Sequence, residues 1–279
     1  MRFGVHIPNF GDFHDLRAIA ELAHDAEVAG WDGFFLWDHI LYARTKRPVI
    51  DPWIALAAIA MRTERIRFGP LVTALARRRP WKVARETVSL DHLSGGRLIL
   101  GVGLGFPPDN EFARFGEDPD PKVRAGKLDE GLDILVGLWS GKPFHYAGQH
   151  YQVERTVFWP PPVQVPRIPI WVAGTWPKHL APFRRAARWD GVCPEGAGKM
   201  TLHDQRVMLD YIRQHRPAEA GPFDVVRAAR LPTGDVGEVR ATIVAWEAAG
   251  VTWWIVGTTG RPGAYADMRA RILDGPPRT

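Results

Sequence analysis

The fold is decided by residues 65–105, whose sequence is RIRFGPLVTALARRRPWKVARETVSLDHLSGGRLILGVGLG. This stretch contains an apolar run over 66–73, a segment of helical length over 80–93 and a second apolar run over 97–103. Strands that are apolar on both faces are typical of a parallel sheet covered by helices. The stretch therefore predicts a strand, a crossover helix and a second, parallel strand.

The same alternation extends in both directions along the chain. Short apolar runs predict strands over residues 3–7, 33–37, 66–73, 97–103, 168–173, 191–193, 224–229 and 252–256. Segments with helical spacing follow them over residues 16–28, 52–61, 80–93, 124–139, 178–188, 202–215, 236–249 and 265–273. Eight such units predict a (β/α)8 barrel that forms one domain over residues 1–279, and an open doubly wound sheet is the main alternative.

One segment, residues 141–167, interrupts this alternation. Two β-like runs, 144–146 and 150–153, flank Ala147-Gly148-Gln149, which predicts a β-hairpin. The three prolines at 160–162 then require an extended return to the next strand. We expect an insertion between the fourth and fifth barrel strands, packed on the barrel.

Composition excludes several classes of protein. Hydrophobic residues make up 46% and charged residues 24%, as in ordinary globular enzymes. The single cysteine, Cys193, excludes a disulfide framework and a cysteine-based zinc cluster, and we expect it to be a buried strand residue. The net charge of +5 comes from basic residues spread along the chain, so we expect no nucleic-acid partner. With no long apolar run and no signal-like start, we expect a cytoplasmic protein without a membrane partner.

The carboxyl ends of the strands are where such barrels bind ligands. These positions hold mostly aromatic and small residues and few acids, which suits a flat, partly apolar cofactor better than a metal ion. His39 follows Trp37 and Asp38 at the second strand, where an imidazole can donate a proton or a hydrogen bond to a bound ring; the alternative is a residue that only caps the loop. Asp38 is not expected to orient His39, because neighbouring strand residues face opposite sides.

Glycines and arginines give weaker signals. The glycines at 101, 103 and 105 do not open a helix, so they favour close approach of a ring to the backbone over a dinucleotide motif. Gly174-Thr175 can contact a phosphate if Pro177 opens a helix, and the alternative is an ordinary turn. The run Arg77-Arg78-Arg79 is typical of a solvated face, although it can also neutralise an acidic cofactor tail.

Several of these motifs also occur together, in order, in a known family. They are RP at 79–80, ARET at 84–87, LDHLSGGR at 90–97, GVGLG at 101–105, LWSG at 138–141 and PIWVAG at 169–174. In these the chain resembles the luciferase-like monooxygenase family of flavin- or deazaflavin-dependent oxidoreductases, most densely over residues 1–190. The family fold is a (β/α)8 barrel with an insertion.

The resemblance implies that reduced FMN or the deazaflavin F420 binds at the strand ends, with no metal, and it leaves the two cofactors open. Trp37-Asp38-His39 is similar to the motif that faces the ring in F420-dependent members. The third strand is implied to bulge beneath the ring, with a non-proline cis peptide between Leu71 and Val72. Gly174-Thr175 matches the region that contacts the cofactor phosphate.

The expected site follows from both arguments. His39 is the expected catalytic residue; Trp37, Asp38, Leu71, Val72, Thr73, Gly103, Gly105, Gly174 and Thr175 are expected to bind the cofactor; and Asn9, Phe106 and Trp176 are expected to line a substrate pocket. Phe106 stands where sugar-phosphate-oxidising F420 members have a glutamate. This difference speaks against a sugar dehydrogenase and favours a small apolar substrate.

The expected activity is hydride transfer to the substrate, or oxygen activation if the cofactor is FMN. A non-catalytic flavin-binding relative and a nicotinamide-dependent dehydrogenase are the alternatives. The resemblance further implies a homodimer and, with FMN, a reductase that supplies the reduced cofactor.

Overall fold

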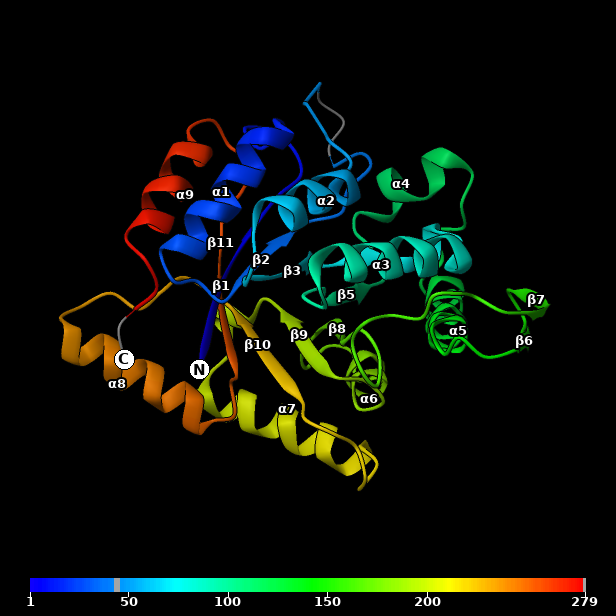
Figure 1. Ribbon diagram of the computed structural model, residues 1–279. Coiled ribbons are helices and arrows are strands. Elements are labelled where there is room, and N and C mark those ends of the chain that lie inside the picture. The colour runs from blue at the N-terminus through cyan, green and yellow to red at the C-terminus, as the bar shows by residue number, and fades with distance from the viewer. Residues whose placement is uncertain (43–45, 278–279) are drawn as a thin grey trace.

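The computed structural model describes residues 1–42 and 46–277, and its centre is a parallel β-sheet (Figure 1). In these residues the sheet has nine strands in the order β3-β2-β1-β11-β10-β9-β8-β5-β4. The strands are β1 (Arg2–Ile7), β2 (Gly33–Leu36), β3 (Arg67–Pro70), β4 (Thr73–Ala74), β5 (Leu100–Gly103), β8 (Ile170–Thr175), β9 (Gly191–Glu195), β10 (Asp224–Ala228) and β11 (Trp253–Gly257). Every pair in the order is parallel, as the sequence predicts.

The sheet closes because β3 and β4 are two halves of one barrel strand. β3 pairs with β2, whereas β4 pairs with β5. A parallel bridge between Phe68 and Leu98 joins the two ends of the strand order. Gly69 allows this approach, since a Cβ there would lie 1.8 Å from the Ile99 carbonyl oxygen. The eight-stranded barrel is confirmed, but the third strand is broken at residues 71–72 rather than continuous over 66–73.

Helices surround the barrel on its outside (Figure 1). They are α1 (Leu16–Val28), α2 (Pro52–Arg62), α3 (Pro80–Ser94), α4 (Pro108–Glu111), α5 (Pro121–Trp139), α6 (Ala181–Ala186), α7 (Leu202–His215), α8 (Val236–Ala248) and α9 (Ala264–Leu273), with 3-10 turns η1 (Leu75–Arg77), η2 (Ala113–Phe115) and η3 (Ala197–Lys199). No helix among the described residues is long and apolar enough to cross a membrane.

Two helices begin three residues away from their predicted starts, and a third helix was not predicted. α5 begins at Pro121 rather than 124, because the Asp120 side chain accepts hydrogen bonds from the amides of residues 122 and 123. α6 begins at 181 rather than 178, which leaves Pro182 in the first turn, where proline is tolerated. The short α4, just after β5, was not predicted at all.

The barrel interior is filled below its carboxyl end. Its core combines Phe35, Leu71, Ile99, Trp171, Cys193, Val226, Trp253 and Ile255, all buried. Trp254 and Val256 alternate with Trp253 and Ile255 and belong to the larger core that lies between the strands and the helices. Cys193 is thus the buried strand residue that the sequence predicts.

The predicted hairpin is confirmed as β6 (Phe144–Ala147) and β7 (Gln152–Thr156), which are antiparallel. It projects beside α5, at the edge of the molecule in Figure 1. The Glu130 carboxylate of α5 accepts hydrogen bonds from the backbone amides of Gln149, His150 and Tyr151 at 2.8–3.1 Å. This carboxylate holds the turn of the hairpin on the barrel.

Candidate functional site

A cavity of about 460 Å³ lies at the carboxyl ends of the strands. It is lined by His6, Trp37, Asp38, His39, Tyr42, Leu71, Val72, Gly105, Phe106, Ala173, Cys193, Pro194, Glu195, Gly196 and Ala228. Seven predicted site residues therefore meet there: Trp37, Asp38, His39, Leu71, Val72, Gly105 and Phe106. A larger groove of about 790 Å³ is lined by residues 230–234 and 274–277, but none of the predicted site residues lines it.

The floor of the cavity is the break between β3 and β4. The peptide between Leu71 and Val72 is cis, as predicted. Gly101 and Gly103 of β5 pack directly behind it: a Cβ at Gly101 would lie 2.4 Å from the Pro70 carbonyl oxygen, and one at Gly103 would lie 2.8 Å from Val72. Gly103 therefore makes room for the bulge, and its contact with a cofactor stays a prediction.

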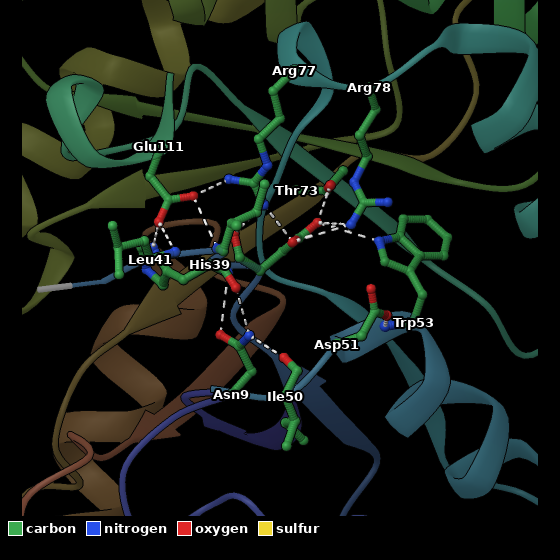
Figure 2. Close-up of polar contacts among 12 residues, drawn as sticks. Asn9, His39, Leu41, Ile50, Asp51, Trp53, Thr73, Arg77, Arg78 and Glu111 are labelled. Atoms are coloured by element: carbon green, nitrogen blue, oxygen red, sulfur yellow. Dashed lines mark hydrogen bonds and ion pairs between the residues drawn. The ribbon is translucent and has the colours of Figure 1, made fainter. Parts of the chain in front are cut away.

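His39 is held at the side of the cavity by Asn9 (Figure 2). The Asn9 amide nitrogen donates to the carbonyls of His39 and Ile50 at 2.8 and 2.7 Å, and its oxygen accepts from the His39 amide at 3.1 Å. Asn9 is fully buried and does not line the cavity. It positions the His39 segment, and its contact with a substrate stays a prediction.

Glu111 of α4 orients the His39 ring. One carboxylate oxygen lies 3.0 Å from His39 Nδ1, and the carboxylate also accepts from the amides of Ile40 and Leu41 at 3.1 and 3.2 Å. The buried Glu111 is ionised, so Nδ1 must be the donor. His39 Nε2 has no hydrogen-bond partner among the described residues and remains available to a ligand.

Arg77 joins Glu111 to Asp38 (Figure 2). It forms ion pairs with both carboxylates and donates to the Asp38 carbonyl at 2.7 Å. Asp38 also accepts from the Thr73 hydroxyl and, at 3.2 Å, from the Trp53 indole. The Arg77, Asp38 and Glu111 side chains are at most 2% exposed. We call this buried network of Arg77, Asp38, Glu111 and Thr73 the Arg77 cluster. The polar atoms of Asp38 and Thr73 are used within this cluster rather than in contact with a cofactor.

The cluster keeps both carboxylates charged. Burial raises the pKa of Asp38, but the Arg77 and Arg78 guanidiniums outweigh it and lower this pKa below its usual value. Burial likewise opposes ionisation of Glu111, and the His39 hydrogen bond and Arg77 lower its pKa overall. The expected solvated face of the arginine run is therefore wrong for Arg77, and only Arg79 is exposed.

Gly174 and Thr175, which are predicted to contact a phosphate, do not line the main cavity. Thr175 and Trp176 line a neighbouring cavity of about 470 Å³, which shares Glu195 and Gly196 with the main one. The Thr175 hydroxyl donates to the Glu195 carboxylate at 3.2 Å, which places negative charge where a phosphate was expected. Gly174 is required for packing, since a Cβ would lie 2.4 Å from Pro182. Because α6 begins at Ala181, these residues do not open a helix directly, and their contact with a phosphate, which the family resemblance also implies, stays a prediction.

Sequence reasoning did not predict Glu111, Arg77 or His6 as site residues, nor several residues that line the cavity, such as Tyr42. Few acidic residues lie near the strand ends, so an acid such as Glu111 could have been recognised there as a candidate site residue. His6 accepts a hydrogen bond at Nδ1 from the Trp37 indole, 3.0 Å away, and burial lowers its pKa to about 4. In the part of the chain that the structure describes, no group of three or more His, Cys, Asp or Glu side chains could hold a metal ion.

The chain thus forms a (β/α)8 barrel with a cavity at its strand ends, over a cis-peptide bulge and beside a fixed imidazole. Residues 1–230 match the family of luciferase-like monooxygenases. The chain belongs to this family.

Relatives and solved structures agree with this assignment. The chain is 32% identical over 221 residues to the F420-dependent glucose-6-phosphate dehydrogenase of Amycolatopsis mediterranei, covering 77% of this chain and 64% of that protein. A match to an uncharacterised protein of Sinorhizobium fredii, 34% identical, covers 60% of this chain but only 46% of that relative, so the chain spans about half its length. The F420-dependent tetrahydromethanopterin reductase from Methanopyrus kandleri has the same fold, with a TM-score of 0.76, 18% identity and 98% of both chains covered.

The Arg77 cluster makes a testable prediction. Arg77→Met leaves two carboxylates buried without their cation, so the free energy of unfolding should fall by about 3–5 kcal/mol at pH 7. Arg79→Met, in the same run but exposed, should change it by less than about 0.5 kcal/mol. Both are measured by urea denaturation.

At acid pH, the difference in the free energy of unfolding between wild type and Arg77→Met should become smaller. Asp38 and Glu111 have lowered pKa values in the folded protein, so the stability they contribute is complete above their unfolded pKa values, about 4, and is lost as the pH falls below them. Equal stabilities of Arg77→Met and Arg79→Met at pH 7 would show that the cluster does not hold the fold.

Proposed function

We propose that this protein is an oxidoreductase that binds reduced F420 or FMN over Leu71 and Val72 and uses it to transform a small apolar organic substrate. The observation that carries the proposal is the 460 Å³ cavity, whose floor is the cis-peptide bulge and whose side carries the fixed His39 ring. Its volume lies in the usual range for cofactor sites. The F420-dependent relative at 32% identity supports the same class of chemistry.

The residues of the cavity fit a planar ring system. Leu71, Val72 and Ala173 offer an apolar surface, and Trp37 and Tyr42 add aromatic walls. Bound there, either cofactor would supply the redox chemistry, as a hydride donor or, for FMN, by reaction with oxygen. The protein's own part is to orient the ring, exclude water and provide proton transfer.

His39 is the group that moves a proton in this proposal. Glu111 accepts from Nδ1, which fixes the ring and leaves Nε2 to exchange a proton with a ligand. Because Arg77 and two backbone amides hold Glu111 in turn, His39 needs no rearrangement to act.

Phe106 supports the apolar substrate. Its side chain lines the cavity although the residue is 71% exposed. An apolar substrate beside the cofactor would cover this ring and remove it from water. If the cofactor is FMN, the proposal includes a partner reductase, and in either case a homodimer.

A fluorescence titration tests the proposal. F420 and FMN are added separately to the purified protein, and we expect saturable one-to-one binding of one of them. Tight binding of F420 makes the protein a deazaflavin-dependent hydride-transfer enzyme, and tight binding of FMN makes it a flavin-dependent enzyme that receives reduced cofactor. The proposal fails if the folded protein binds neither.

His39→Ala tests the proton transfer. We expect turnover to fall about 10²- to 10⁴-fold, since the variant lacks the general acid–base group, while cofactor affinity changes little. The control is His203→Ala, which removes an exposed imidazole on α7. Turnover of His39→Ala at the wild-type rate would remove His39 from the mechanism.

Phe106→Ala tests the apolar substrate. Loss of the covered ring should raise KM for the substrate about ten- to a hundredfold. Phe115→Ala is the matched control, because Phe115 is 54% exposed and lies outside the cavity. Unchanged kinetics of Phe106→Ala would contradict this part of the proposal.

A further inference from the structure

His6 faces the inside of the barrel mouth and has no role in the proton transfer described above. Phe3, Val5 and Ile7 of β1 belong to the core between strands and helices, so His6, which alternates with them, points inward. It lines the 460 Å³ cavity at the carboxyl end of β1.

Gly257 provides the room for the His6 ring. The two residues are register partners on the adjacent strands β1 and β11. A Cβ at Gly257 would lie 1.8 Å from His6 Nε2, so this edge of the imidazole occupies the space that a side chain at 257 would fill. The ring is thus placed by the backbone of two neighbouring strands.

Trp37 fixes which nitrogen of His6 carries the proton. The Trp37 indole N–H donates to His6 Nδ1 over 3.0 Å, and an indole nitrogen can only donate. Nδ1 must therefore present a lone pair, which leaves the proton of the neutral ring on Nε2. Burial, which lowers the pKa of His6 to about 4, keeps the ring in this form at neutral pH.

The Nε2–H group of His6 has no hydrogen-bond acceptor among the described residues. The ionisable groups that share the cavity with it are Asp38, His39, Tyr42, Cys193 and Glu195. None of them makes a hydrogen bond or ion pair with His6 in the described part of the chain, where its one hydrogen bond is the one from Trp37. The site therefore holds a fixed, uncharged donor without a protein partner.

We propose that His6 is a ligand-binding residue whose Nε2–H donates a hydrogen bond to a carbonyl oxygen or ring nitrogen of the planar cofactor. This inference rests on the proposed function and adds a contact to it. β1 is two strands away from the bulge, or roughly 10 Å at the usual strand spacing, so a tricyclic ring that begins over Leu71 and Val72 reaches across to His6. An uncharged donor suits a ring carbonyl or nitrogen, which carries no full charge.

Nitrogen NMR tests the donor itself in the protein without cofactor. In ¹⁵N-histidine-labelled protein at pH 7, His6 should show an unprotonated Nδ1 and a protonated Nε2. Trp37→Phe keeps an aromatic ring but removes the N–H that selects this form, so the signals of His6 should shift toward a mixture of tautomers. A protonated Nδ1 in the wild type would overturn the inference, whatever the cofactor.

Cofactor titration tests the contact. His6→Met, which is similar in size but has no donor, should bind F420 or FMN about tenfold more weakly than wild type, the loss of one neutral hydrogen bond. His6→Gln restores a side-chain N–H and should recover most of this affinity. The control His203→Met replaces an exposed imidazole and should bind as wild type, and equal thermal unfolding midpoints confirm that the variants are folded.

The outcomes separate the two proposals. Wild-type affinity in His6→Met overturns the role of His6 and leaves the proposed function intact. If His6→Met binds the cofactor like wild type but has a raised KM for the substrate, the His6 donor contacts a substrate carbonyl, and the cofactor contact is overturned. A wild-type protein that binds neither cofactor contradicts the proposed function itself, and with it this inference.

Discussion

The buried pairing of Arg77 with Asp38 and Glu111 is the interaction on which the site depends. The three residues come from η1, from the segment after β2 and from α4, so one guanidinium joins three separate strand-end segments. Charges that are this deeply buried are tolerated only when they are paired and hydrogen-bonded. The pairing therefore fixes the His39 segment relative to the bulge at Leu71 and Val72, since only β4 separates η1 from the bulge in the chain.

The two imidazoles of the cavity have opposite hydrogen-bond partners at Nδ1. At His39, a carboxylate accepts from Nδ1, which leaves Nε2 free to contact a ligand. At His6, an indole donates to Nδ1, which leaves the ring neutral and its Nε2 a donor. In the proposed function, one histidine transfers a proton and the other binds the ligand, and the neighbour at Nδ1 determines which role each ring takes.

Much of the fold could be predicted from local patterns, and much of the site could not. Apolar runs and helical spacing found the eight units, because burial on both faces leaves a strong local signal. The helix predicted over 178–188 begins only at Ala181, and Pro182 is the signal for this start, because proline is favoured in the first turn of a helix. The break at Leu71 and Val72 came from the family resemblance, and no periodicity in the run 66–73 marks it.

The contacts of the site could not be predicted because they join residues that are far apart in the sequence. Glu111 and His39 are 72 residues apart, and Arg77 and Asp38 are 39 apart, so only the closed barrel brings them together. The arginine run looked solvated because its buried partners lie on other segments. Asn9 looked like a pocket residue because strand-end position alone does not tell whether an amide faces the ligand or holds a neighbouring loop.

The most direct test is a crystal structure of the protein with the cofactor it binds. We expect the ring to lie against Leu71 and Val72, with His39 Nε2 within hydrogen-bond distance of a ligand in the cavity. A cofactor bound instead in the groove lined by residues 230–234 and 274–277, or a His39 ring turned away from Glu111, would contradict it.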